Sequence, residues 1–160
     1  MINPNFRKHF FVGATLVVLM GANIQAQEKS VAPEINKAFR KPDITDFQGK
    51  FEKEGREAFE HRDEIVKACN LREGMQVADV GAGTGLFSRL FAPKVGVKGI
   101  VVAVDISEDF LKHIQESARE QNLANIQTVL CKQDSVELPD ASVDLVFTCD
   151  TYHHFEFPFK

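Results

Sequence analysis

The sequence is poor in cysteine: with three in 160 residues, at least one thiol must be unpaired. None of the three lies in a Cys-x-x-Cys spacing, which argues against a cysteine zinc site. We therefore predict that Cys69, Cys131 and Cys149 are buried thiols and that the chain holds no metal. Internal repeats and low-complexity runs are also missing, which excludes a repeat array and overall disorder.

An excess of positive charge is missing as well. The formal net charge is -4 at pH 7, which argues against a nucleic-acid-binding surface. Hydrophobic residues make up 44% of the chain and charged residues 26%, an ordinary composition for a globular protein. The length suits a single folded domain.

The first 26 residues lack acidic side chains and show the three zones of a secretory signal. Two basic residues precede an apolar run over 10–22, which is short of the ~20 residues that a membrane span needs. Ala26 offers a small residue for cleavage, whereas Ile24 is larger than usual at its position. We predict a signal peptide over 1–26 and a periplasmic or secreted protein. The alternative is an uncleaved anchor, with the domain facing the cytoplasm and touching the membrane only through this segment.

Strand-like and helix-like patterns alternate from Gln76 onward. Apolar, partly β-branched runs predict strands, apolar stripes at helical spacing predict the intervening helices, and Ser107 is suited to cap one of them. This alternation predicts an α/β fold, a parallel sheet with helices on both faces. Residues 27–50 show little periodicity and predict an irregular lead-in, while 51–70 predict amphipathic helices. The strands are expected over 76–80, 99–104, 126–131 and 143–149.

The first predicted strand runs into a glycine-rich turn, VADVGAGTG (77–85). Ligands of open α/β sheets bind beyond the carboxyl ends of the strands, where Gly81, Gly83 and Gly85 permit a sharp turn and a close approach of the next helix. The dinucleotide fingerprint is incomplete, because Leu86 stands where its third glycine should be. A pyrophosphate ligand is therefore disfavoured. Tight strand-to-helix packing is the alternative to ligand binding.

Two acidic residues accompany the turn. Asp79 would repel a pyrophosphate but suits a cationic group such as an amine or a sulfonium. Asp105 ends the second strand, where a carboxylate can accept both hydroxyls of a ribose. Together they predict a nucleoside that carries a positive centre. For Asp105, capping of the following helix is the alternative role.

At this point the chain resembles the class I (Rossmann-like) S-adenosylmethionine-dependent methyltransferases. The resemblance rests on four motifs in order: VADVGAGTG (77–85), VVAVDIS (101–107), CKQDSVELP (131–139) and DLVFTCDTYHHF (144–155). It implies a methyltransferase domain over 51–160 that uses S-adenosyl-L-methionine and methylates an acceptor, expected to be a small molecule. A domain that binds this cofactor without turnover and a nicotinamide-dependent oxidoreductase are the alternatives.

The same resemblance implies roles for individual residues. The methionine part of the cofactor would lie against Asp79 and the glycine turn, and the ribose against Asp105. The adenine would contact Ile106 and the segment that follows the third strand, and the methyl donor would lie beside Cys149 and Asp150. The residues so assigned to the cofactor are Asp79, Gly81, Gly83, Gly85, Asp105, Ile106, Asp134, Ser135 and Asp150.

Methyl transfer from a sulfonium depends mainly on orientation, so few catalytic side chains are required. If the acceptor must lose a proton, the expected bases are Tyr152 and His153, with His154 as a further candidate. Lining of the pocket is the alternative role for these side chains.

The family's sheet has seven strands in the order 3-2-1-4-5-7-6, and this chain stops after the fourth. We therefore expect a C-terminally truncated fold whose fourth strand has an unpaired edge, through which copies of the chain would self-associate. The same order separates Cys131 from Cys149 by three strand spacings, about 14 Å at ~4.8 Å per step. A disulfide needs Cα atoms within ~7 Å, so both should remain thiols.

Overall fold

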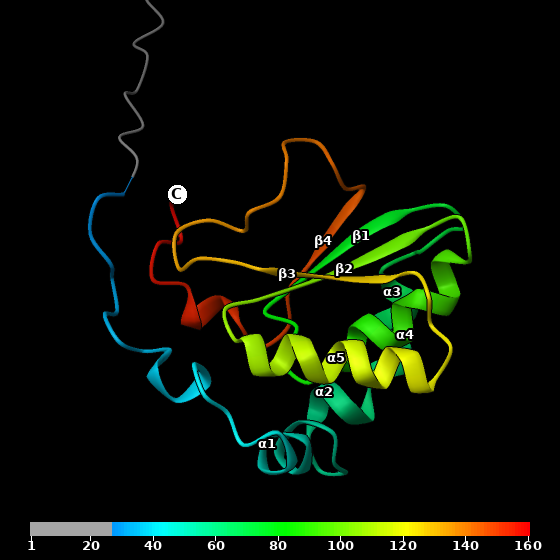
Figure 1. Cartoon of the computed structure of the whole chain (residues 1–160), viewed down its shortest axis with the longest axis horizontal. Coiled ribbons are helices and arrows are strands. Elements are labelled where there is room, and N and C mark those ends of the chain that lie inside the picture. The colour runs from blue at the N-terminus through cyan, green and yellow to red at the C-terminus, as the bar shows by residue number, and fades with distance from the viewer. Residues whose placement is uncertain (1–26) are drawn as a thin grey trace, which may run out of the picture.

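Four short parallel strands form the centre of the structure, a computed structural model that describes residues 27–160 (Figure 1). They are β1 (Gln76–Val80), β2 (Ile100–Asp105), β3 (Ile126–Leu130) and β4 (Leu145–Phe147), in the order β3-β2-β1-β4. The α/β prediction and the strand order are confirmed. β4 is shorter than the predicted strand over 143–149 because only three of its residues pair with β1. The predicted signal segment, 1–26, lies outside the described residues.

Three helices pack against one face of the sheet, below it in Figure 1. Helix α4 lies against β1 and β2, and α5 lies against β2 and β3. The crossovers β1-α4-β2 and β2-α5-β3 advance in the same direction along the sheet, and crossovers of one hand that do so place their helices on the same face. The three helices are α3 (Arg62–Ala68), α4 (Leu86–Val95) and α5 (Glu108–Glu120). The short α2 (Glu57–Glu60) precedes α3.

The opposite face of the sheet is covered without a helix. Residues 131–144 lead from β3 back to β4 across this face as a loop (Figure 1). Leu138, Val143 and Phe155 pack there against the buried side chains of β1 and β2. Helices were predicted on both faces, whereas within residues 27–160 those that pack on the sheet occupy one. The reason is local, because the returning segment is polar, contains a proline and has no helical stripe of apolar residues.

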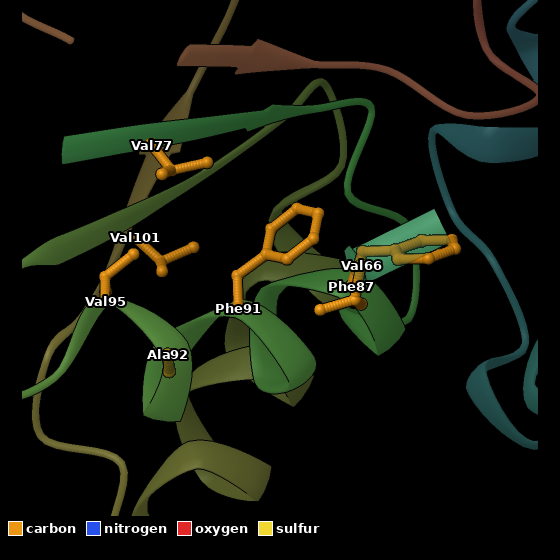
Figure 2. Packing of buried hydrophobic residues seen from close by; sticks show 7 residues of the cluster. All are labelled: Val66, Val77, Phe87, Phe91, Ala92, Val95 and Val101. Carbon is orange, nitrogen blue, oxygen red and sulfur yellow. The ribbon is translucent and has the colours of Figure 1, made fainter. Parts of the chain in front are cut away.

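The main core lies between α4 and strands β1 and β2 (Figure 2). Val77 of β1 and Val101 of β2 are register partners that face the core, and Phe91 and Val95 of α4 pack against them. Phe91 is fully buried and meets Phe147 of β4 edge-on, with ring centroids 4.9 Å apart. This packing holds the carboxyl ends of β1, β2 and β4 at one edge of the sheet.

The segment before β1 is more ordered than its composition predicts. Residues 27–50, expected to be an irregular lead-in, contain the 3-10 helix η1 (Lys37–Phe39) and most of helix α1 (Ile44–Phe51). Asp43 caps α1 by accepting a hydrogen bond from the Asp46 backbone N–H at 3.0 Å. Phe47 of α1 packs edge-on against Phe110 of α5, with centroids 5.4 Å apart.

The N-terminal part of this segment lies beside the C-terminal residues (Figure 1). The Val31 backbone N–H donates to the Glu156 carbonyl at 2.9 Å.

No helix within residues 27–160 is both long and apolar enough to span a membrane. All three cysteines are free, as predicted, with β3 and β4 at opposite edges of the sheet, but each is only partly buried rather than buried.

Candidate functional site

A cavity of about 830 Å³ opens at the carboxyl ends of the strands. Its walls come from the ends of β1 and β2, from the loops after β3 and β4, and from the segment before β1. The volume lies within the roughly 300–1,000 Å³ of small-molecule sites. The position at the strand ends is the one that open α/β sheets use for ligands.

The glycine turn forms part of this cavity with its backbone. Gly81 and Gly83 both line it and have positive φ angles of 74° and 54°. A Cβ atom at Gly81 would overlap the side chain of Thr151, so no other residue fits there without rearrangement. The Gly81 N–H donates to the Val104 carbonyl at 2.8 Å, which ties the turn to β2.

Gly85 differs from the other two glycines, because it does not line the cavity. It precedes α4 with φ 78°, and an added Cβ would lie 2.6 Å from Cγ1 of Ile114 in α5. Close packing of α4 against α5 therefore explains why this position holds a glycine. The cofactor role that the resemblance implies for Gly85 has no counterpart in the cavity.

Asp79 is buried in β1 with 3% of its surface exposed. Burial raises the pKa of its carboxyl to about 6; the hydrogen bond from Ser88, 2.6 Å from Oγ to Oδ2, opposes this rise, and the nearby charge of Asp105 adds to it. Within residues 27–160, no lysine or arginine forms an ion pair with Asp79. A cationic ligand group in the cavity would therefore favour the ionised carboxylate.

Asp105, the last residue of β2, joins two loops of the site. Its Oδ2 accepts the Gly83 N–H at 2.9 Å, and its Oδ1 accepts the Ser107 N–H at 2.9 Å. Burial raises the pKa of this carboxyl, and these hydrogen bonds oppose the rise. Each oxygen keeps a lone pair for a ligand hydroxyl. The cap of α5 is Ser107, whose Oγ accepts the Phe110 N–H, so Asp105 is not needed in that role.

Three residues predicted to meet an adenine come together on one wall. Ile106 follows β2, and Asp134 and Ser135 lie in the loop after β3. Asp134 forms an ion pair with Lys160 at 2.5 Å, which lowers the pKa of its carboxyl. A ligand amino group would share this carboxylate with the lysine.

Asp150 also lines the cavity. It follows β4, at the opposite edge of the sheet from β3, and has a positive φ of 51°. Its carboxylate accepts from Arg56 Nη2 at 2.6 Å, and the guanidinium of Arg56 lies 4.5 Å from the centroid of the Phe51 ring. Before β1, the sequence suggests only His61 and Arg62 as site residues, close to the cofactor's carboxylate, and neither of them lines the cavity. The cavity residues from that segment are Asn36, Phe39, Phe51, Arg56 and Ala58.

The candidate bases divide into two groups. Tyr152 is 60% exposed and does not line the cavity, whereas His153 and His154 do. His154 is partly buried, and burial, with a smaller effect of His153, lowers the pKa of its ring. Its ring packs edge-on against Phe39, with centroids 4.8 Å apart.

Two thiols also face the cavity, Cys131 after β3 and Cys149 after β4. Burial, followed by the charge of Asp105, raises the pKa of Cys131 to about 12, so it is an un-ionised thiol. Within the described part of the chain, no cluster of three or more His, Cys, Asp or Glu side chains is arranged to hold a metal.

Residues 77–159 match a family described as the methyltransferase domain, and the match covers more than half of the chain. The chain belongs to this methyltransferase family. The demethylmenaquinone methyltransferase of Listeria welshimeri is 33% identical to it over 85 residues, 53% of this chain and 36% of that protein. The ubiquinone/menaquinone biosynthesis C-methyltransferase of Shewanella sediminis is 30% identical over 82 residues, 51% of this chain and 33% of that protein. The aligned part thus spans about a third of these relatives.

Solved methyltransferase structures share the fold of this methyltransferase domain. A SAM-dependent methyltransferase from Aquifex aeolicus aligns with a TM-score of 0.65 and 30% identity over 74% of this chain and 62% of that one. A putative methyltransferase from Bacillus halodurans aligns with a TM-score of 0.54 and 26% identity over 60% and 40% of the two chains. The cavity residues Asn36, Phe39 and Arg56 of the present chain precede the segment matched to the family.

Proposed function

We propose that this methyltransferase domain binds S-adenosylmethionine in the cavity and catalyses transfer of its methyl group to a small molecule. The observation that carries the proposal is the pair of buried carboxylates, Asp79 and Asp105. They lie at the ends of adjacent strands beside the glycine turn, and neither has a cationic partner among residues 27–160.

The residues present suit this cofactor. A sulfonium or ammonium group near Asp79 would lower the raised pKa of its carboxyl, and the free lone pairs of Asp105 suit the two ribose hydroxyls. The two acids would instead repel a pyrophosphate, which disfavours the nicotinamide alternative. The cavity, at about 830 Å³, leaves room for an acceptor beside the nucleoside.

The bound cofactor supplies an electrophilic methyl group, and the protein's part is to orient and enclose the reactants. Phe51 covers the glycine turn, 3.4 Å from where a Cβ of Gly83 would lie, and its ring is backed by Arg56. Phe39, Phe155 and Phe157 add apolar surface to the cavity. The named relatives act on demethylmenaquinone or in quinone biosynthesis, which supports an apolar, small-molecule acceptor.

The test is methyl transfer by the full chain from S-adenosylmethionine labelled in the methyl group to reduced demethylmenaquinone. We expect labelled product from the wild type. Asp105→Asn should lower kcat/KM for the cofactor about 10- to 100-fold, because it weakens the hydrogen bonds to a ribose. The exposed Asp63→Asn is the control and should change nothing.

Two outcomes would contradict the proposal in different ways. Tight cofactor binding without methyl transfer to any acceptor would make the domain a binding module. Undiminished kcat/KM in Asp105→Asn, with the variant folded, would remove the ribose assignment.

A further inference from the structure

We propose that His154 is the base that takes the acceptor's proton during methyl transfer, a role that rests on the proposed function. Among Tyr152, His153 and His154, it alone both lines the cavity and is partly buried. Three observations support this assignment: its anchor on the glycine turn, the packing around its ring, and the absence, among residues 27–160, of a hydrogen-bond partner for Nδ1.

The backbone of His154 is anchored to the glycine turn. Its N–H donates to the Thr151 carbonyl at 2.7 Å within the 3-10 helix η2 (Tyr152–His154). The Thr151 side chain packs into the space that a Cβ of Gly81 would need, and its hydroxyl donates to the Cys149 carbonyl at 2.9 Å. The histidine is therefore held beside the part of the cavity to which the methyl donor is assigned.

The ring of His154 is packed by residues far away in the sequence. Phe39 lies edge-on to it at 4.8 Å between centroids and is itself supported by Phe47 at 5.3 Å. The buried Asn36 donates from Nδ2 to the His154 carbonyl at 2.9 Å. The segment before the family match thus fixes the orientation of the ring.

The surroundings favour the neutral ring. Nδ1 is enclosed and has no hydrogen-bond partner among the described residues, so no acceptor stabilises the charge of an imidazolium through this nitrogen. The His153 ring, 4.2 Å away between centroids, also lowers the pKa of the His154 ring.

Within residues 27–160, no carboxylate forms an ion pair with His154. Glu156, two residues further on, is buried, and its Oε1 has no hydrogen-bond partner among the described residues. On the packed segment, Lys37 is exposed and Arg40 pairs with Glu34. After β4, Asp150 pairs with Arg56. A neutral imidazole with a free lone pair is the state that can accept a proton.

In the tautomer that carries its hydrogen on Nδ1, His154 would take the proton of a hydroxyl of the reduced quinone on Nε2. The electron pair left on the oxygen is shared with the adjacent ring carbon, and this carbon would bond to the methyl group while the electrons of the methyl–sulfur bond stay on the sulfur. The hydrogen on that ring carbon would then leave as a proton, which restores the aromatic ring. The exposed His153 beside it then offers a path for the proton to water.

The direct test is His154→Gln in the full chain, assayed with methyl-labelled S-adenosylmethionine and reduced demethylmenaquinone. We expect kcat to fall about 10²- to 10⁴-fold, the range for loss of a general base, with the cofactor Kd changed less than twofold. In the wild type, kcat should rise with pH through a midpoint below pH 6.5, because the base acts when deprotonated and its pKa is lowered. His154→Gln should lack this limb.

The matched control is His113→Gln, which removes a partly buried histidine of α5 that also has an unpartnered ring nitrogen but lies outside the cavity. Its kcat and pH profile should equal those of the wild type. Phe39→Leu keeps the base but loosens its packing, so the midpoint of the acidic limb should move up toward 6.5.

Retention of wild-type kcat and of the acidic limb by folded His154→Gln would overturn this role while leaving the proposed function intact. A wild-type chain that binds the cofactor but methylates no acceptor would contradict the proposed function and this role with it.

Discussion

At the scale of single residues, Asp79 makes the free protein sensitive to pH. Burial raises the pKa of its carboxyl from 3.8 to about 6. Between these values the folded chain keeps a proton that the unfolded chain has lost, so the free energy of unfolding should fall as pH rises from about 4 to about 6. Above pH 6 the full penalty applies, on the order of 1–3 kcal/mol.

We therefore expect Asp79→Asn to be more stable than the wild type at pH 7 by on the order of 1–3 kcal/mol, with the difference disappearing near pH 4. Urea unfolding of the cofactor-free chain at several pH values measures this. Asp63→Asn, an exposed carboxylate, should keep the wild-type pH dependence. An Asp79→Asn chain with that same dependence would show that Asp79 does not titrate as described.

Sequence reasoning placed Asp79 and Asp105 correctly at strand ends, because the apolar periodicity of the strands fixes where each one stops. It could not separate Tyr152 from His153 and His154. These three residues form one turn of 3-10 helix, in which successive side chains point about 120° apart. Which of them faces the cavity depends on how the turn packs against Thr151 and Phe39, and the local sequence does not carry that information.

At the scale of elements, an ion pair holds the C-terminal end of helix α1 against α4. Arg89 of α4 donates to both carboxylate oxygens of Glu52 at 2.8 Å, and the two side chains are only 11% and 18% exposed. Arg89 also donates to the Thr84 carbonyl of the glycine-rich loop at 2.6 Å. This chain of contacts joins α1 to the loop that lines the cavity.

Glu52→Gln should weaken the docking of α1 by about 1–3 kcal/mol, since it leaves a largely buried guanidinium without its charged partner. Faster amide hydrogen exchange over 44–51 is the expected observation. The control is Asp46→Asn, which breaks an exposed pair with Lys50 worth at most about 0.5 kcal/mol. Equal exchange in the two variants would contradict the role of the buried pair.

Helices α4 and α5 could be predicted because each carries an apolar stripe, and α5 also has its Ser107 cap. Helix α1 could not. It has eight residues with Gly49 among them, and isolated helices of this length are unstable in water. Its aromatic contacts with Phe39 and Phe110 stabilise it, and these are visible only once the chain is folded.

At the scale of the whole molecule, the strand order followed from the family motifs, whereas the covering of the second face by the loop over 131–144 did not. Only one part of the cavity could likewise be predicted from the sequence. Its floor of strand ends and glycine turn was readable from local motifs, but its cover comes from residues before β1 and the last residues of the chain. β4 is an edge strand in the described chain, with Val146 62% exposed, and self-association through it stays a prediction.

The most direct test of the central claim is a calorimetric titration of the full chain with S-adenosylmethionine and, separately, with NAD. The two buried acids beside the glycine turn predict binding of S-adenosylmethionine at one site per chain and no binding of NAD. Binding of NAD, with no heat from S-adenosylmethionine, would contradict the account.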